Sequence, residues 1–135
     1  ESCKNKKIKK FIFSSSSSVY GDTNFFPTNE STPTNPISPY ALQKLIGEQY
    51  CILFKKIYEL DTVILRYFNV YGKGEEHKKD QASPVSKFTW QIREKGYLNL
   101  FEGSDKFYRD FVCVNDLSRL VLYNNQNLSK QPNHL

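Results

Sequence analysis

Tyr40 and Lys44, in the stretch YALQK, are the residues whose types and spacing first suggest chemistry. On a helix, side chains four positions apart lie one turn apart on the same face. An ammonium close to a phenol favours the phenolate and lowers the pKa of the phenol toward neutrality, so the tyrosine can act as a general base. Tyrosine and lysine are both common in this chain, so the surroundings of the pair must decide its meaning.

The surrounding sequence predicts a strand, a helix and a second strand. KFIFSSS, residues 10–16, is aromatic and β-branched and ends in hydroxyls, which is typical of a buried strand. Apolar residues recur at helical spacing over residues 39–59, where Ser38 can cap the helix and Pro39 suits its first turn. TVILRYFNV, residues 62–70, is nearly continuously apolar, like strands of parallel sheets covered on both faces. These elements predict a parallel sheet in an α/β protein.

This topology predicts that the serine run and the tyrosine lie at the same edge of the sheet. Ligands of doubly wound sheets bind at the carboxyl ends of the strands, where a strand-end serine can meet a tyrosine on the following helix. The five serines of residues 14–18 stand between FIF and VYG. This setting favours a strand end over a flexible serine linker.

The second half of the chain predicts shorter elements separated by charged loops. They are a helix over residues 84–95, strands over residues 97–101 and 111–114, and a helix over residues 117–124 capped by Asn115 or Asp116.

Composition excludes several classes of protein. With 39% hydrophobic and 15% aromatic residues the chain is not a disordered tail, and its apolar runs are too short to span a membrane. Cys3, Cys51 and Cys113 are widely spaced, which argues against a disulfide scaffold or a zinc site and favours the reducing cytoplasm. Five of the lysines behind the net charge of +5 fall in residues 4–10, which we interpret as a solvated loop. We therefore expect no metal, nucleic-acid or membrane partner.

Three motifs together resemble a known family. FSSSSSVYG, SPYALQK and LRYFNVYG, in this order and at these separations, are similar to the extended short-chain dehydrogenase/reductases that modify nucleotide sugars. The resemblance implies that Ser16 hydrogen-bonds the reacting sugar hydroxyl and that Tyr40 is the catalytic base. It also implies that Lys44 binds the nicotinamide ribose and activates the tyrosine, and that Val70 contacts the nicotinamide.

The second half of the chain resembles one group in that family, the ADP-glycero-manno-heptose 6-epimerases, through RYFNVYG, EEHK and LFEGSDKFYRDFV. In this resemblance Lys78 corresponds to a second acid/base. The residues implied to contact the nucleotide-sugar substrate are Asn69, Phe101, Glu102, Gly103, Ser104 and Arg109, together with Asp80 and Lys87. Asp80 and Lys87 stand where the group has a serine and a histidine, which puts the sugar in doubt more than the reaction class.

The activity implied by the resemblance is epimerisation by transient hydride transfer to NADP or NAD, with NADP favoured by the heptose-epimerase likeness. Two bases on opposite faces, Tyr40 and Lys78, make inversion at the exocyclic carbon feasible. A UDP-hexose 4-epimerase, acting on glucose/galactose or N-acetyl sugars, and a non-catalytic nucleotide-sugar-binding relative stay open. A 4,6-dehydratase is disfavoured because Ser17 and Ser18 stand where those enzymes place an Asp-Glu pair.

The six glycines supply no glycine-rich turn of the kind that binds a dinucleotide. We therefore expect a fragment of a Rossmann-like doubly wound parallel sheet plus the start of a smaller substrate-binding domain. Residues 1–72 would be the C-terminal half of the dinucleotide-binding domain, and residues 73–135 part of the sugar-nucleotide region. We expect the fragment alone to be inactive and the full-length protein to be a cytoplasmic homo-oligomer.

Overall fold

The computed structural model describes residues 8–100, 102–106 and 108–126. They form two compact units. The first contains the described residues up to Tyr67 and those from Leu120 onward, and the second is Phe68–Arg119. No helix in the described part of the chain is long and apolar enough to cross a membrane.

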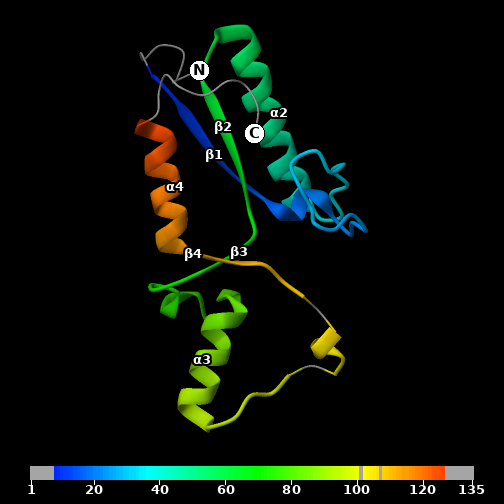
Figure 1. The fold of residues 1–135 in the computed structure, drawn as a ribbon, viewed down its shortest axis with the longest axis vertical. Coiled ribbons are helices and arrows are strands. Elements are labelled where there is room, and N and C mark those ends of the chain that lie inside the picture. Colours follow the sequence, from blue (N-terminus) through cyan, green and yellow to red (C-terminus); the bar gives the residue numbers. More distant parts are fainter. Residues whose placement is uncertain (1–7, 101, 107, 127–135) are drawn as a thin grey trace. The chain divides into compact units, whose positions relative to one another are not determined.

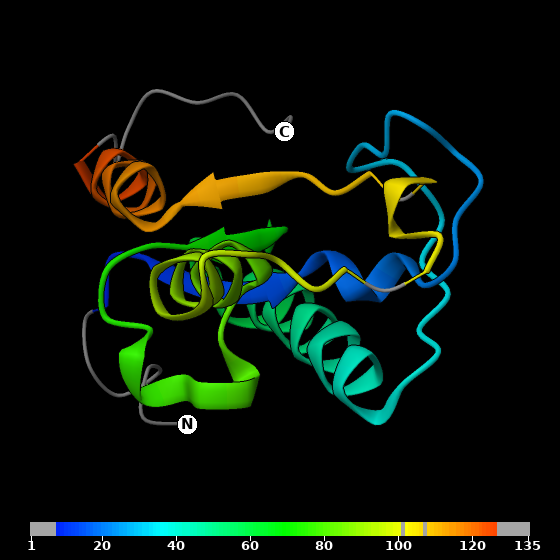
Figure 2. The ribbon, with the colours of Figure 1, turned by 90° about the horizontal axis from the view of Figure 1, so that it is seen from below.

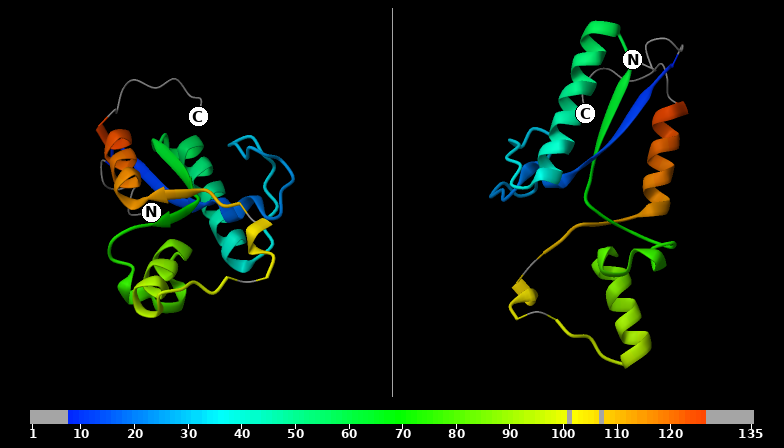
Figure 3. Two further views of the ribbon diagram at one scale, coloured as in Figure 1. Left: turned by 60° about the horizontal axis from the view of Figure 1, so that its bottom comes forward. Right: turned by 180° about the vertical axis from the view of Figure 1, so that it is seen from behind.

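The first unit contains the predicted strand, helix and strand. β1 (Phe11–Ser16) pairs in parallel with β2 (Thr62–Tyr67), from Phe11 opposite Thr62 to Ser16 opposite Tyr67. Between them in sequence runs α2 (Pro39–Tyr58), which packs along both strands (Figures 1 and 3). The parallel pairing and the crossover helix confirm the prediction for this half of the chain.

The sequence explains where α2 begins and ends. The Ser38 side chain accepts a hydrogen bond from the Ala41 amide at 3.1 Å, and Pro39 occupies the first turn, as predicted. The helix ends at Tyr58, because Glu59 adopts a left-handed conformation with φ of 53°. Gly47 lets the helix approach β1 closely, since a Cβ at this position would lie 2.3 Å from the Phe13 ring.

The chain leaves β1 through a 3-10 helix, η1 (Ser17–Tyr20), whose Val19 and Tyr20 side chains are buried. Burial of these two side chains anchors the turn in the core of the first unit. A loop of residues 21–38 then runs out and returns to the start of α2 (Figure 2). The serine run is therefore a strand end followed by a tight turn, and the linker interpretation is excluded.

The predicted strand over residues 62–70 is wrong in one respect, because the structure divides it at Phe68. β3 (Asn69–Tyr71) belongs to the second unit, where it pairs in parallel with β4 (Phe111–Cys113). Ser16, the last residue of β1, is opposite Tyr67, so the chain beyond Tyr67 has no further partner on β1. One nearly continuous apolar run in the sequence thus supplies strands to two different sheets.

The remaining elements are η2 (Glu76–Gln81), α3 (Pro84–Lys95), η3 (Ser104–Lys106) and α4 (Val114–Gln126). The α3 helix agrees with its prediction. It ends at Gly96, which has φ of 76° and donates its amide to the Ile92 carbonyl.

Two predictions for the second half are wrong. Residues 97–100 form no strand, because the Asn99 amide donates to the Gln91 side chain at 3.2 Å instead of to a neighbouring strand. The last helix begins directly after β4, so Asn115 and Asp116 lie inside its first turn and do not cap it.

Candidate active site

The end of β1 presents Ser16 at the start of the η1 turn. Its hydroxyl accepts hydrogen bonds from the Ser18 amide at 3.2 Å and from the Ser18 hydroxyl at 2.9 Å. It is therefore the N-cap of η1 and has an extended backbone. The cap fixes the position of this hydroxyl relative to the strand end.

Tyr40 and Lys44 occupy the first two turns of α2. The Lys44 ammonium lies 5.6 Å from the centroid of the Tyr40 ring and 5.6 Å from that of the Phe13 ring. It also donates a 2.8 Å hydrogen bond to the backbone carbonyl of Ser14. Tyr40 is 54% exposed, so its ring is open to solvent. The structure therefore brings the predicted tyrosine and lysine together and joins the lysine to the strand that carries Ser16.

An ion pair with a buried carboxylate and a half-buried guanidinium lies one turn further along α2. Glu48 is 2% exposed, and its carboxylate accepts two hydrogen bonds from Arg66 of β2, from Nε at 2.9 Å and from Nη2 at 2.7 Å. The same carboxylate accepts the hydroxyl of buried Ser15. The hydrogen bond to Glu48 raises the pKa of Arg66, although burial opposes this effect. Burial, followed by the negative charge of Glu48, raises the pKa of the Cys51 thiol.

Sequence reasoning missed this ion pair, although a signal was present. Arg66 interrupts the apolar stretch TVILRYFNV, and Glu48 lies four residues after Lys44 on the predicted helix. A charged residue within a predicted buried strand requires a partner, because an unpaired buried charge is very costly.

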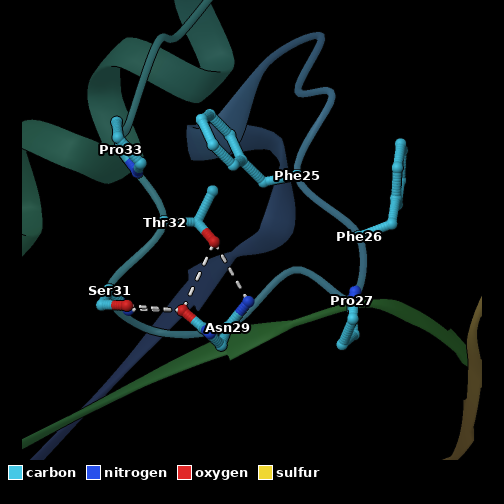
Figure 4. Close-up of a pocket in the computed structure, with 7 residues that line it drawn as sticks. All are labelled: Phe25, Phe26, Pro27, Asn29, Ser31, Thr32 and Pro33. Carbon is cyan, nitrogen blue, oxygen red and sulfur yellow. Dashed lines mark hydrogen bonds between the residues drawn. The ribbon is translucent and has the colours of Figure 1, made fainter.

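The loop of residues 21–38 contains a pocket of about 310 Å³ (Figure 4). It is lined by Phe25, Phe26, Pro27, Asn29, Ser31, Thr32 and Pro33. None of the predicted site residues lines it, and Phe26 stands 80% exposed at its rim. We assign no catalytic role to this pocket.

Lys78 lies in η2 of the second unit. Its ammonium is 3.3 Å from the carboxylate of buried Glu75, and its side chain is 55% exposed. Glu75 also accepts the Ser83 amide, the Ser83 hydroxyl at 2.6 Å and the Ser86 hydroxyl at 2.5 Å. Burial raises the pKa of Glu75, but the hydrogen bonds from Ser83, Ser86 and Lys78 outweigh it and lower that pKa to about 2. Lys78 is thus paired with a stable carboxylate that also anchors the start of α3.

The other predicted site residues of the second unit lie on its strands, loops and first helical turn. Asn69 begins β3 and donates its side-chain amide to the Asp110 carbonyl at 2.9 Å. Val70 is opposite Val112 of β4. Lys87 lies in the first turns of α3, and its amide donates to the Ser83 carbonyl.

Four further predicted residues near η3 and β4 are exposed or half-buried. Glu102 and Arg109 are exposed, whereas Gly103 and Ser104 are half-buried. Phe101 lies outside the described residues, as does the side chain of Asp80. The roles assigned to all these residues stay predictions.

Comparison with known proteins decides the family. The model of the NAD dependent epimerase/dehydratase family matches residues 1–135. The chain belongs to this family. The chain is 41% identical over 126 residues to the ADP-L-glycero-D-manno-heptose-6-epimerase of Alkalilimnicola ehrlichii, covering 90% of this chain and 39% of that protein.

Solved structures of two epimerases confirm the fold. The UDP-N-acetylglucosamine 4-epimerase of Methanobrevibacter ruminantium M1, in complex with UDP-N-acetylmuramic acid, matches with a TM-score of 0.79 and 42% identity over 87% of this chain and 37% of that one. The UDP-glucose 4-epimerase of Thermotoga maritima with UDP-glucose matches with a TM-score of 0.79 and 36% identity. This match covers 87% of this chain and 38% of that one. The α/β, Rossmann-like prediction is thus confirmed for a chain that spans about two fifths of its relatives' length.

Proposed function

We propose that this chain is part of a longer nucleotide-sugar epimerase in which Tyr40 is the general base. The observation that carries the proposal is the position of the Lys44 ammonium, 5.6 Å from the Tyr40 ring centroid and hydrogen-bonded to the Ser14 carbonyl at the strand end. The ammonium thus lies one helical turn from the proposed base, on the same face of α2. The chain spans about two fifths of the length of its relatives, which supports a longer protein.

In this proposal the chain's own residues move and position a proton. Ser16 hydrogen-bonds the reacting sugar hydroxyl, and the half-exposed Tyr40 takes the proton of that hydroxyl as the carbon is oxidised. Lys44 compensates the negative charge that the phenol oxygen carries while the proton is on the sugar. In the return step a proton goes back to the same sugar oxygen, so the reaction changes a stereocentre with no net oxidation.

The residues present fit a nicotinamide cofactor. An ammonium has three donors, and Lys44 uses one of them on Ser14, which leaves donors for ribose hydroxyls. The residues that we propose to bind the cofactor are Tyr40 and Lys44 in the first unit and Val70 in the second. When bound, NAD(P) accepts and returns the hydride of the sugar carbon. The resemblance to heptose epimerases favours NADP, and without a glycine-rich turn we expect the 135-residue chain alone to bind no cofactor and to be inactive.

The substrate that we propose is an ADP-glycero-manno-heptose, with Lys78 as the second acid/base. The half-exposed ammonium of Lys78 is available to a substrate, and the Glu75 carboxylate holds this ammonium through an ion pair. Arg109 suits the diphosphate, because a guanidinium fork can pair two phosphate oxygens at once. The other proposed substrate contacts are Asn69, Asp80, Lys87, Phe101, Glu102, Gly103 and Ser104.

The second candidate is a UDP-sugar 4-epimerase. It is favoured by the similarity to the two solved 4-epimerases, which is as strong as the similarity to the heptose enzyme. In this case Lys78 needs no catalytic role, because a ring carbon can be inverted with a single base.

The test uses the full-length protein with ADP-D-glycero-D-manno-heptose, UDP-glucose and UDP-N-acetylglucosamine, with stereochemistry followed by proton NMR. Inversion at the exocyclic carbon that is lost in Lys78→Ala, but kept in the exposed control Lys73→Ala, supports the heptose assignment. Inversion at ring C4 that survives Lys78→Ala supports the second candidate. Turnover retained in Tyr40→Phe, with the similarly exposed Tyr97→Phe as the matched control, contradicts both.

We also propose that the full-length protein is a cytoplasmic homo-oligomer. Exposed apolar side chains follow one face of α2, at Leu42, Ile46, Tyr50, Leu53 and Ile57. Their spacing of three and four residues suits a helix–helix contact. The described thiols of Cys51 and Cys113 are free, as in a reducing compartment. Analytical ultracentrifugation of the Ile46→Lys variant tests this face, since a charge at its centre would dissociate the oligomer.

A further inference from the structure

The ion pair of buried Glu48 and half-buried Arg66 connects the segments that carry the proposed chemistry. Glu48 lies one turn after Lys44 on α2. Its carboxylate accepts a hydrogen bond from the hydroxyl of Ser15, the residue directly before Ser16. Arg66 extends the connection in the other direction. Its Nη1 donates to the Tyr20 hydroxyl at 3.0 Å and to the Glu30 carbonyl at 3.3 Å, and its guanidinium lies 4.8 Å from the centroid of the Tyr20 ring.

Fold stability alone does not account for this arrangement. Removing two charges from water is costly, and buried ion pairs can often be replaced by apolar side chains of similar volume without loss of stability. An apolar pair would fill the same space but would define no hydrogen-bond directions. The five polar contacts of Arg66 and Glu48 instead define direction and distance for β1, β2, α2 and the η1 turn.

Two anchors one turn apart determine how α2 lies on β1. Lys44 bonds the Ser14 carbonyl at 2.8 Å, and Glu48 accepts the Ser15 hydroxyl at the next residue of the strand. Between them the Phe13 ring lies against Gly47. A single contact would leave the helix free to slide or rotate, whereas two contacts four residues apart fix both movements.

We propose that Glu48 and Arg66 are positioning residues that hold the Ser16 turn and the Tyr40–Lys44 helix at the separation that proton transfer needs. The inference rests on the proposed function of those three residues. Neither Glu48 nor Arg66 touches the substrate in this proposal, because the Glu48 side chain is 2% exposed and the Arg66 side chain, 21% exposed, is bonded to Glu48, Tyr20 and Glu30. Small displacements of reacting groups can cost about a hundredfold in rate, so the positioning effect is measurable.

The experiment uses the full-length protein and two variants. Glu48→Leu combined with Arg66→Met replaces the pair by apolar side chains, and Glu48→Asp keeps the charges but shortens the link by one methylene. Glu59→Gln, an exposed carboxylate at the end of the same helix, is the control. Melting temperature, KM and kcat are measured with the three nucleotide sugars named above, and a crystal structure of each variant reports the distance from Lys44 Nζ to the Ser14 carbonyl.

We expect both variants to melt within a few degrees of the unmodified protein, to keep KM within about twofold and to lose at least tenfold in kcat, with the lysine–carbonyl bond lengthened. A folded variant with unchanged kcat and an unchanged bond overturns the inference. If the double variant does not fold, Glu48→Asp decides. The Tyr40→Phe variant separates the proposed function from the positioning role of Glu48 and Arg66. If Tyr40→Phe stays active, the proposed function fails. The distance from Lys44 Nζ to the Ser14 carbonyl in the variant structures still tests the positioning role.

Discussion

Replacing Gly47 by alanine adds one methyl group at the closest approach between α2 and β1. Ordinarily this change stabilises a helix, because glycine is about 1 kcal/mol less favourable than alanine in a helix interior. Here the added Cβ would lie 2.3, 2.9 and 3.0 Å from three atoms of the Phe13 ring. Contacts of a Cβ atom shorter than 3.4 Å are rare, so the ring or the helix must move by roughly 1 Å.

The two effects have opposite signs, and their magnitudes decide the result. Overpacking of a core typically costs about 1–3 kcal/mol, which exceeds the helical gain of about 1 kcal/mol. We therefore expect Gly47→Ala to destabilise the protein by about 1 kcal/mol. The displaced Phe13 ring lies 5.6 Å from the Lys44 ammonium, so kcat should fall as well.

Phe13→Leu removes the end of the ring that blocks the methyl group. In that background the clash is absent, so Gly47→Ala should become stabilising by up to about 1 kcal/mol. The assay is urea unfolding of the four proteins of this cycle, with Gln49→Ala, exposed on the same helix, as a control expected to change stability by less than about 0.5 kcal/mol. Stabilisation by Gly47→Ala in the unmodified background would refute the reasoning.

Three further predictions concern caps and charges. Ser38→Ala removes the cap of α2 and should cost about 1 kcal/mol in urea unfolding, whereas Ser38→Asp should cost little. Arg66→Met alone leaves the buried Glu48 carboxylate unpaired and should cost about 3–5 kcal/mol, more than the double variant with Glu48→Leu, and equal losses would contradict this. The pKa of Glu75 is about 2 in the folded protein against an ordinary value of 4.5. Its contribution to the free energy of unfolding is therefore present above about pH 4.5 and disappears as the pH falls toward 2. The stability difference between Glu75→Gln and the unmodified protein should therefore narrow over that range in thermal unfolding, and a constant difference would contradict the assignment.

Local signals in the sequence were sufficient for the first half of the fold. Ser38, Pro39 and the helical spacing that follows them predicted α2 to within a residue of its end, and the apolar runs predicted β1 and β2. The spacing of Tyr40 and Lys44 predicted that they share a helical face, and the structure confirms it. These features depend on residues close in sequence, which is why a single chain reveals them.

What the sequence did not reveal depends on partners far away along the chain. The division of the predicted strand at Phe68 follows from where β1 ends and from the pairing of β3 with β4. An apolar run in the sequence indicates neither of these features. The hydrogen bond from Asn99 to Gln91 replaces a strand that the local composition favoured. The pair of Glu48 and Arg66 joins residues 18 positions apart, so only the fold makes them neighbours.

Several of the contacts that hold this site together end on main-chain atoms. Lys44 donates to the carbonyl of Ser14, and Arg66 donates to the carbonyl of Glu30. Every amino acid supplies such a carbonyl, so these contacts do not depend on which side chain occupies positions 14 and 30. Evolution can therefore vary both positions while Lys44 and Arg66 stay constrained, and a library that randomises positions 14 and 30 should retain many folded, active members.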